Sequence, residues 1–468
     1  MPDRKRIHLI GVCGTAMATL AALLKSRGHD VRGSDQQIYP PMSDFLASEG
    51  IRTMTGYAAE HVTEDVDLVI VGNAISRGNP ELEAVLERKV RHCSLPEAIR
   101  EHFLWGARSI VIAGTHGKTT TTSLAGWLLT NGRLDPTVLV GGIALNFGDA
   151  GSSYRVGAGR DFVIEGDEYD SAFFDKTAKF LKYLPDVAVV NNIEFDHADI
   201  YANLDEIRLA FRRLANLVPR NGLLLLGADS PDAAALADVA KSPVETFGMS
   251  ADSTWRAEAI ETRDGLTRFI VRQRGELYGT FESPLLGVHN VRNALASIAV
   301  GSHVGLAASD LAQGLRAFKG IKRRLEVVGV AGGVTVLDDF AHHPTAVRET
   351  VQAVRQRFGD RRVVAIFEPR SASSCRRVFQ ADFARAFGAA DEVVIAAVFR
   401  SSLPESERLS AEQLVDDVRA AGRQARHIPE IDAIIQTIVA ERQPGDVVVL
   451  MSNGGFGGIH QKLVQALS

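Results

Sequence analysis

Short runs of Val, Ile and Leu recur along the chain and alternate with longer stretches in which apolar residues have helical spacing. Continuous apolar runs are typical of parallel strands covered on both faces, and the stretches between them predict helices. The runs that we interpret as strands include residues 7–12, 29–35, 67–73, 109–114, 334–340, 362–369, 392–399 and 446–455. Helices are expected at residues 16–28, 80–89 and 119–130. The pattern therefore predicts an α/β fold built on parallel sheets.

The chain is too long for one ordinary core. Its 468 residues suggest three domains at a prior of about 150 residues per domain. We expect a small βαβ domain at residues 1–105, a second domain at 106–320 and a third at 321–468. No long Pro/Gly/Ser linker, internal repeat or low-complexity tract marks the boundaries.

Composition points to a globular, soluble protein, with 46% hydrophobic and 23% charged residues. No apolar run approaches the roughly 18 residues that span a bilayer, so no membrane partner is expected. The basic start "MPDRKR" resembles the beginning of a signal peptide, but the apolar segment after it is too short and is interrupted by glycine. We therefore expect a cytoplasmic protein.

The charge and the cysteine content argue against a nucleic-acid-binding protein and against a fold held by disulfides or zinc. A net charge of −5 and a pI near 6.2 leave no basic stripe, so nucleic acid is not expected as a partner. Cys13, Cys93 and Cys375 are odd in number and far apart, and they suggest neither a disulfide framework nor a zinc site.

The segment "VIAGTHGKTTTT" is typical of a phosphate-binding loop, except that the spacing of its glycines differs from the usual pattern. The usual pattern, G-x-x-x-x-G-K-[ST], holds phosphates with backbone N–H groups and lysine, and magnesium with the hydroxyl. Gly117, Lys118 and Thr119 match its end. Ile112 replaces the first glycine, and the one earlier glycine is Gly114. Because the loop joins a predicted strand to a predicted helix, where N–H groups are unpaired, we interpret it as a shortened phosphate loop rather than a turn with a surface lysine.

A second glycine-rich turn, "GVCGTAM", follows the first predicted strand, and Asp35 ends the next one. A dinucleotide fingerprint would read G-x-G-x-x-G, but Cys13 and Ala16 occupy the second and third glycine positions after Gly11. An NAD-dependent oxidoreductase is therefore only weakly supported. Gly11 and Gly14 still permit close approach of a diphosphate to a helix N-terminus, and a purely structural turn stays open.

Carboxylates gather after the predicted strand in "DFVIEGDEYD", where the acidic residues are Glu165, Asp167, Glu168 and Asp170. A carboxylate at this position can hold magnesium against the phosphates of a loop in the same domain. Glu165 is favoured because it emerges directly from the strand. The alternative is a solvated acidic turn.

Three further motifs carry polar side chains whose roles the residues alone leave open. "NNIEFDHADIY" places His197 beside Asp196 and Asp199, although a lone histidine is more often structural than a ligand. "HNVRNAL" contains groups that could hydrogen-bond a purine edge, or it is simply the polar start of a helix. "DDFAHHP" contains Asp338, Asp339, His342 and His343, followed by a proline suited to a helix start.

Together and in this order, "GTHGKTTT", "EGDEYD", "NNIEFDH", "HNVRNA", "KRRLE" and "DDFAHHPT" resemble the motifs of the Mur ligase family, the ATP-dependent amide-forming enzymes of peptidoglycan synthesis. The resemblance covers nearly the whole chain, and the shortened phosphate loop is similar to that family's own variant. It implies an N-terminal Rossmann-like domain for a UDP-sugar, a central ATPase domain with the phosphate loop, and a C-terminal Rossmann-like domain that binds the acceptor and completes the ATP site.

Within the family, "GVCGTAM", "GSDQQIYPPMS", "FEPRSASS" and "MSNGGFGGIH" resemble the branch that joins the recovered tripeptide L-Ala-γ-D-Glu-meso-diaminopimelate to UDP-N-acetylmuramate in peptidoglycan recycling. Tetra- and pentapeptides stay open as acceptors. The alternative is the branch that adds L-alanine to the same nucleotide in de novo synthesis, which normally carries a His-Arg pair where this chain has "EPRS". Several family members carry a carbamylated lysine in the helix after "DH", but "LDEIRLAFRRLANL" has no lysine, which supports a branch acting directly on UDP-N-acetylmuramate.

The resemblance also implies roles for individual residues. ATP contacts are implied for Gly114, Thr115, His116, Gly117, Lys118, Thr119, Thr120, His289, Asn290, Asn293, Arg324 and Asp339. UDP-sugar contacts are expected from Gly11, Cys13, Gly14, Thr15, Ser34 and Asp35, and acceptor contacts from His342, Glu368, Arg370 and Ser371. The expected catalytic residues are Lys118, Glu165 and His197, and two Mg²⁺ ions are expected on Thr119, Glu165 and His197.

The implied reaction has two steps. The muramate carboxylate attacks the γ-phosphorus of ATP to give an acyl phosphate and ADP, and the peptide amine then displaces phosphate. Alignment and charge neutralisation supply most of the catalysis. A non-enzymatic sensor that binds the nucleotide without releasing phosphate stays open as a different class.

Overall fold

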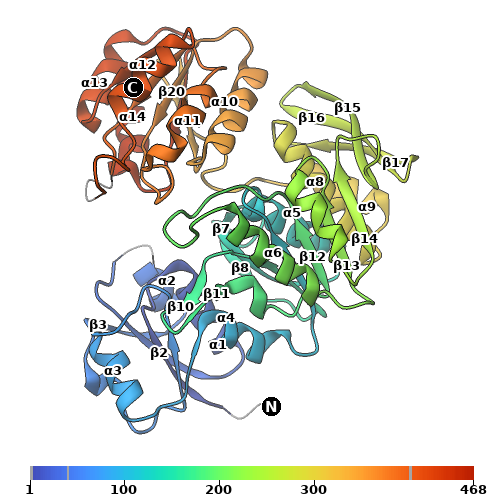
Figure 1. Cartoon of the computed structure of the whole chain (residues 1–468), viewed down its shortest axis with the longest axis vertical. Coiled ribbons are helices and arrows are strands. Elements are labelled where there is room, and N and C mark those ends of the chain that lie inside the picture. The colour runs from blue at the N-terminus through green and yellow to red at the C-terminus, as the bar shows by residue number, and fades with distance from the viewer. Residues whose placement is uncertain (1–3, 40–41, 400–402) are drawn as a thin grey trace.

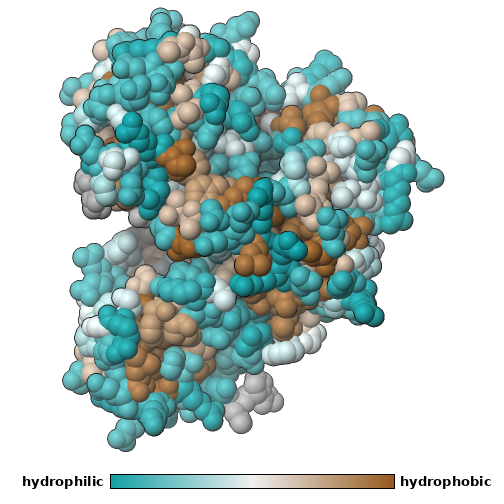
Figure 2. Space-filling model, in the orientation of Figure 1, coloured by the Kyte–Doolittle hydropathy of each residue, from teal (hydrophilic) through white to brown (hydrophobic). Residues whose placement is uncertain are grey.

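The computed structural model describes residues 4–39, 42–399 and 403–468, which form three α/β domains (Figure 1). The N-terminal domain and the C-terminal domain lie at opposite ends of the long axis, and the central domain connects them. Figure 2 shows a recess between the two end domains on one side of the molecule. The α/β class with parallel sheets and the three-domain architecture are confirmed.

The N-terminal domain is built on a parallel five-stranded sheet with strand order β3-β2-β1-β4-β5. Its elements are β1 (Arg6–Ile10), α1 (Thr15–Ser26), β2 (Asp30–Asp35), α2 (Met42–Ser48), β3 (Arg52–Thr55), β4 (Leu68–Val71), α3 (Pro80–Glu87), β5 (His92–Ser94) and α4 (Leu95–Ile99). The turn after β1 lies at the carboxyl end of the sheet, where open α/β sheets bind ligands.

The central domain contains a ten-stranded mixed sheet with the order β17-β16-β15-β14-β13-β12-β6-β9-β7-β8. Its strands are β6 (Arg108–Ala113), β7 (Thr137–Ala144), β8 (Ser152–Arg155), β9 (Asp161–Glu165), β12 (Val187–Val190), β13 (Leu223–Gly227), β14 (Val244–Gly248), β15 (Trp255–Arg263), β16 (Leu266–Gln273) and β17 (Glu276–Ser283), with a separate hairpin of β10 (Asp170–Ala172) and β11 (Asp175–Ala178). Its helices are α5 (Lys118–Asn131), α6 (Leu204–Leu217), α7 (Pro231–Ala234), α8 (Val288–His303) and α9 (Ala308–Arg316).

The C-terminal domain has a six-stranded sheet of order β18-β19-β23-β20-β21-β22, parallel except for the edge strand β18. Its elements are β18 (Glu326–Ala331), β19 (Val334–Asp339), α10 (Pro344–Phe358), β20 (Val363–Phe367), α11 (Gln380–Ala386), β21 (Glu392–Ile395), α12 (Ala411–Ala420), β22 (Gln424–His427), α13 (Ile431–Glu441), β23 (Val447–Met451) and α14 (Ile459–Leu467).

Side-chain alternation explains why the strands are buried on both faces. In β6, Val111 and Ala113 pack in one hydrophobic core, whereas Ile110 and Ile112 pack in the core on the opposite face. The first of these cores continues without interruption into the N-terminal domain, while the two cores of the C-terminal domain are separate clusters. The C-terminal domain therefore has cores of its own, and Phe195 of the central domain packs against one of them by stacking on Phe379.

Register brings the candidate motifs together at two sheet edges. The carboxyl ends of β9, β6 and β12 are adjacent, because Ile112 pairs with Glu165 and Ala113 pairs with Val190. In the C-terminal domain, β19, β23 and β20 likewise end side by side. Parallel strands thus place residues far apart in the sequence at common edges.

Candidate functional site

The phosphate loop lies between β6 and α5, as expected, and its glycines are required by close packing. Gly114 and Gly117 have φ values of +124° and +81°, which side chains rarely adopt. A Cβ on Gly114 would lie 2.9 Å from the backbone nitrogen of Asn191, and one on Gly117 would overlap the side-chain amide of Asn293. The "HNVRN" motif on α8 therefore packs directly against the loop.

Lys118 is held by a carboxylate that the sequence did not single out. Its ammonium donates to both oxygens of Glu168 at 2.7 and 2.8 Å and to the carbonyl of Gly114 at 2.8 Å. Burial alone would lower the pKa of Lys118, but the carboxylates of Glu168 and Asp167 raise it above its usual value. Lys118 is thus a fixed cation at the mouth of the loop.

Glu168 also contacts His197, whose Nε2 lies 2.9 Å from the same carboxylate. His197 has a left-handed backbone with φ +53°, stabilised by a hydrogen bond from its N–H to Asp196 at 2.7 Å. Lys118, Glu168 and His197 therefore form one polar cluster. The sequence places Glu168 three residues after Glu165, but only Glu165, which emerges directly from the strand, is favoured there as a metal ligand.

Glu165 faces Thr119, the first residue of α5 with a hydroxyl group. Its carboxylate accepts from the Thr119 hydroxyl at 3.1 Å and from the Gly141 N–H at 2.7 Å, and Arg324 donates to the same hydroxyl at 3.3 Å. Burial raises the pKa of Glu165 despite the attraction of Lys118.

These oxygen donors fit Mg²⁺, which prefers carboxylate, hydroxyl and phosphate oxygens. The Glu165 carboxylate and the Thr119 hydroxyl lie 3.1 Å apart, so oxygens of both side chains could reach one cation. The pair of Glu168 and His197 offers one carboxylate oxygen and one imidazole nitrogen beside it.

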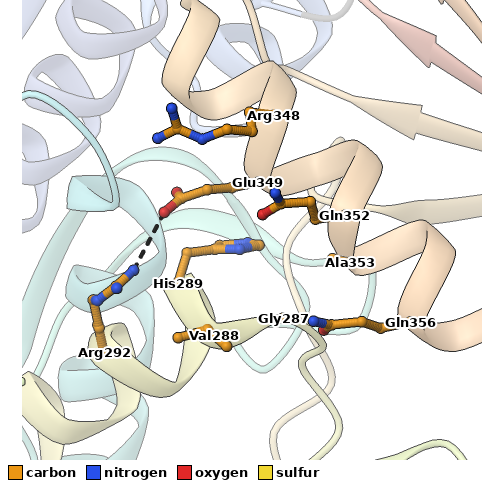
Figure 3. Close-up of a pocket in the computed structure, with 9 residues that line it drawn as sticks. All are labelled: Gly287, Val288, His289, Arg292, Arg348, Glu349, Gln352, Ala353 and Gln356. Carbon is orange, nitrogen blue, oxygen red and sulfur yellow. Dashed lines mark hydrogen bonds and ion pairs between the residues drawn. The ribbon is translucent and has the colours of Figure 1, made fainter. Parts of the chain in front are cut away.

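A cavity of about 340 Å³ opens between the N-terminus of α8 and the side of α10 (Figure 3). His289 projects into it, and an ion pair of 3.3 Å between Arg292 and Glu349 closes one side. Burial lowers the pKa of His289, so the ring is neutral and can accept or donate a hydrogen bond. The remaining lining residues are Gly287, Val288, Arg348, Gln352, Ala353 and Gln356. The cavity combines one residue predicted to contact ATP with α10, which the sequence did not implicate.

The side chains of Asn290 and Asn293 form hydrogen bonds within the protein and do not line the cavity. Asn290 donates to the carbonyl of Leu286 at 2.8 Å, and Asn293 donates to Asn290 at 3.1 Å. Asn293 also accepts from the Thr121 hydroxyl at 3.1 Å. In this structure their side chains are therefore engaged with the protein, and a direct contact with ATP stays a prediction.

Asp339 is similarly occupied at the end of β19. Its carboxylate accepts from the N–H groups of Leu325 and Ala341 at 2.8 and 2.9 Å and from the Thr350 hydroxyl at 3.0 Å. This network fixes the segment that carries Arg324, whose guanidinium lies 5.0 Å from the ring centre of Phe340. The predicted ribose contact of Asp339 stays a prediction.

The predicted acceptor residues gather at the carboxyl end of β20. Glu368 accepts from the Ser452 hydroxyl at 2.5 Å and lies 3.6 Å from Arg370. The Arg370 guanidinium stacks 3.8 Å above the ring of Phe399, and the side chain of Arg370 is 32% exposed. Arg370 is thus positioned by Phe399 and by its ion pair with Glu368, and its guanidinium has five N–H donors, more than this one pair uses, so donors are left for an anionic ligand.

Two contacts describe the surroundings of Arg370. A Cβ on Gly454 would lie 2.7 Å from the guanidinium carbon and closer still to other atoms of the same side chain, so glycine makes room for the arginine. The Ser373 hydroxyl accepts from the Ala198 N–H at 3.3 Å, which joins the segment beside His197 to the loop after β20.

The other acceptor candidates are bonded within the protein. Ser371 shares a hydrogen bond of 2.9 Å with Ser374, and the Nδ1 of His342 lies 2.9 Å from the carbonyl of Phe340. Burial lowers the pKa of His342.

In the N-terminal turn, Gly11 has a φ of +83°, and Cys13 donates its N–H to Asp35 at 2.8 Å. Gly14 and Thr15 lead into α1. Asp35 therefore stabilises the turn. Its predicted contact with the sugar nucleotide requires that the carboxylate binds the ligand while it accepts the hydrogen bond from Cys13.

Ser34 is completely buried beneath this turn. Its hydroxyl donates to Glu81 at 2.5 Å, and the same carboxylate lies 2.9 Å from His8 and 2.6 Å from His61. The backbone carbonyl of Ser34 accepts hydrogen bonds from the N–H groups of Gly11 and Val12. The side chain of Ser34 thus supports the turn from below.

Comparison with known proteins follows the same three-part division. Residues 6–104 match the model described as "Mur ligase family, catalytic domain", residues 112–301 the "Mur ligase middle domain", and residues 323–454 the "Mur ligase, glutamate ligase domain". The chain belongs to the Mur ligase family. The resemblance drawn from the motifs is thereby confirmed, and with it the class of ATP-dependent, ADP-forming amide ligases.

Full-length relatives of two kinds are similar to this Mur ligase. The chain is 40% identical over 464 residues to the UDP-N-acetylmuramate--L-alanyl-gamma-D-glutamyl-meso-2,6-diaminoheptandioate ligase of Haemophilus influenzae, covering 99% of both chains. It is 37% identical to the UDP-N-acetylmuramate--L-alanine ligase of Salinibacter ruber, covering 99% of this chain and 95% of that protein.

A solved murein peptide ligase from Psychrobacter arcticus is 36% identical and aligns over 99% of this chain and 98% of that one, with a TM-score of 0.74. Among the residues described by the structure, no helix is both long and apolar enough to cross a membrane.

Proposed function

We propose that this Mur ligase joins L-Ala-γ-D-Glu-meso-diaminopimelate to UDP-N-acetylmuramate at the expense of ATP, giving ADP and phosphate, in peptidoglycan recycling. The observation that carries the acceptor assignment is Arg370, a guanidinium at the carboxyl end of β20 that is 32% exposed and whose ion pair with Glu368 is 3.6 Å long. A tripeptide that ends in diaminopimelate presents several carboxylates to such a fork, whereas free L-alanine presents one. The names of the relatives that are 40% identical support the same acceptor.

In the proposed mechanism, the phosphate loop and Lys118 hold the ATP phosphates, and Arg324 approaches them from the C-terminal domain. Lys118 is bound to Glu168 in this structure, so the phosphates must share or replace that partner. The lysine would then neutralise charge that develops between the β- and γ-phosphates as the muramate carboxylate attacks.

We further propose two Mg²⁺ ions, one held by Thr119 and Glu165 and a second by His197, with Glu168 beside it. When bound, such ions neutralise phosphoryl oxygens and align the reacting groups. The protein's own contribution is to hold these donors rigidly at adjacent strand ends. Because ATP is the co-substrate, we expect the reaction to take place in the cytoplasm.

The acceptor loop lies next to these groups. The hydrogen bond from Ala198 to Ser373 joins the segment of His197 to the loop that begins at Arg370. An amine anchored by its carboxylates at Arg370 would therefore reach the acyl phosphate from the C-terminal domain. The turn after β1 would hold the diphosphate of the sugar nucleotide through Gly11, Cys13 and Gly14.

A competition experiment tests the acceptor. UDP-N-acetylmuramate and ATP would be incubated with equal concentrations of the tripeptide and L-alanine, and the products weighed by mass spectrometry. We expect the tripeptide adduct to dominate. Predominance of the L-alanine adduct would favour the second candidate, an L-alanine ligase. The relative from Salinibacter ruber, which is 37% identical, is named as such a ligase. Absence of phosphate release with either amine would favour a sensor.

A further inference from the structure

Three side chains from separate motifs converge beside the phosphate loop. His116 lies in the loop itself, Glu194 follows β12, and His343 immediately precedes α10 in the C-terminal domain. The ligand atoms of the three residues all lie within 4.8 Å of one another. None of the magnesium donors discussed above belongs to this cluster.

The two distances from Glu194 to the imidazoles have the scale of a tetrahedral metal site. One oxygen of Glu194 lies 3.1 Å from the Nε2 of His116 and 3.6 Å from the Nδ1 of His343. Ligands bonded to one tetrahedral Zn²⁺ at its usual bond lengths lie about 3.3–3.5 Å apart. Small adjustments of the three side chains would therefore bring them onto a common ion.

Hydrogen bonds around His343 leave its Nδ1 without a proton of its own. Its Nε2 lies 3.1 Å from the carbonyl of Phe195, an arrangement that requires a proton on Nε2. Burial lowers the pKa of His343 to about 4, so the ring is neutral and Nδ1 is an acceptor. Nδ1 accepts a long hydrogen bond of 3.3 Å from the Thr345 N–H and otherwise faces the Glu194 carboxylate.

Glu194 is ionised in these surroundings. Burial would raise its pKa, but hydrogen bonds from His116 and Thr345 hold the pKa at about 2. The Glu194 oxygen lies 3.6 Å from the Nδ1 of His343, and a cation bound by both would replace the hydrogen bond from His116 to Glu194 and the long hydrogen bond from Thr345 to Nδ1, with the His116 proton released to solvent. The Thr345 hydroxyl donates to the same oxygen of Glu194 at 2.6 Å, and the Phe195 carbonyl orients the imidazole, as outer partners do in metal sites.

We propose that His116, Glu194 and His343 form a binding site for a divalent transition-metal ion such as Zn²⁺, with a fourth position open to solvent or ligand. Two imidazole nitrogens and one carboxylate favour such an ion over Mg²⁺, which prefers oxygen. The ion links the phosphate loop to the N-terminus of α10, so it ties the central domain to the C-terminal domain. Occupancy of the site thereby opposes separation of the two domains.

Co²⁺ titration of the full chain without nucleotide tests the site, because four-coordinate Co²⁺ has intense visible bands and octahedral Co²⁺ on oxygen ligands does not. We expect one equivalent of such bands in the wild-type protein and their loss in Glu194→Gln and His116→Gln. Thr345→Val, which removes an outer hydrogen bond while preserving shape, should weaken binding about 10-fold.

His427→Ala is the matched control, because His427 lies 3.2 Å from Glu412 as a histidine–carboxylate pair outside the cluster. It should retain the bands, and thermal melting should show that every variant is folded. Absence of the bands in the wild type would overturn the proposal and leave the cluster a hydrogen-bonded contact only. Bands that survive in folded Glu194→Gln, or that carry the near-ultraviolet signature of thiolate ligation, would also overturn it.

Discussion

Gly454→Ala is expected to impair the proposed tripeptide acceptor by displacing Arg370. The new Cβ would lie 2.1 Å from the Nε of Arg370, whereas ordinary contacts are 3.4–4 Å, so this part of the side chain must retreat by about 1.3 Å or more. The backbone of Gly454 does not have the positive φ that favours glycine, so the substitution itself introduces little strain.

The size of the effect follows from the interaction that is lost. A hydrogen bond to a charged group contributes about 1.5–3 kcal/mol, which corresponds to about 10- to 150-fold in kcat/KM. Arg370→Ala gives the upper limit of this loss. Because the arginine side chain is flexible and partly exposed, the melting temperature should change little.

Gly455→Ala is the matched control, since a Cβ at Gly455 would meet nothing within 4 Å. Initial rates of ADP formation would be measured against tripeptide concentration at saturating ATP and UDP-N-acetylmuramate. The reasoning is refuted if folded Gly454→Ala keeps kcat/KM within about twofold of the wild type, or if Gly455→Ala is equally impaired.

Three further predictions concern the loop, the metal donors and the N-terminal core. Lys118→Ala should reduce ADP formation by about 100-fold or more, because a fixed cation at the phosphates is lost, and near-normal turnover at saturating ATP would contradict this. His197→Ala should reduce turnover with little change in melting temperature, and raised magnesium should partly restore the rate; a large loss of stability with normal specific activity would indicate a structural role. Glu81→Ala should lower the free energy of unfolding by about 3–5 kcal/mol in a denaturant titration, whereas Glu83→Ala, which removes only an ion pair with the exposed Arg77, should change it little. Burial raises the pKa of Glu81, but hydrogen bonds from two histidines and a serine hold it below its usual value, so its stabilising contribution is present above the ordinary carboxyl pKa and is lost as pH falls; a mutational loss that did not shrink on acidification would contradict this assignment.

The sequence predicts the loop and its strand–helix setting well because both depend on local patterns. The helix expected at 119–130 is found as Lys118–Asn131, and the one expected at 16–28 as Thr15–Ser26. The run at 392–399 is strand only over Glu392–Ile395. The residues after Ile395 continue the apolar pattern but are not part of the strand, so composition alone overestimates strand length.

Pairwise geometry could not be predicted in the same way. The sequence favours Glu165 because it directly follows a strand, but it gives no partner for either carboxylate, and in the structure Glu165 faces Thr119 whereas Glu168 binds Lys118. Glu194 lies in the motif "NNIEFDH", but no role was predicted for it, because its partners lie in other motifs. Such contacts depend on strand register and domain packing, which a single sequence does not specify.

The cavity between α8 and α10 has a consequence for the affinity of any ligand that contacts both helices. Its walls come from two domains whose hydrophobic cores are separate, so the binding surface exists only in molecules where those walls meet. The measured dissociation constant of any compound that spans both walls is then the intrinsic value divided by the assembled fraction; a fraction of one tenth weakens it about tenfold. A compound confined to the α8 wall escapes this penalty, and the difference between two such compounds would report the population of the assembled state.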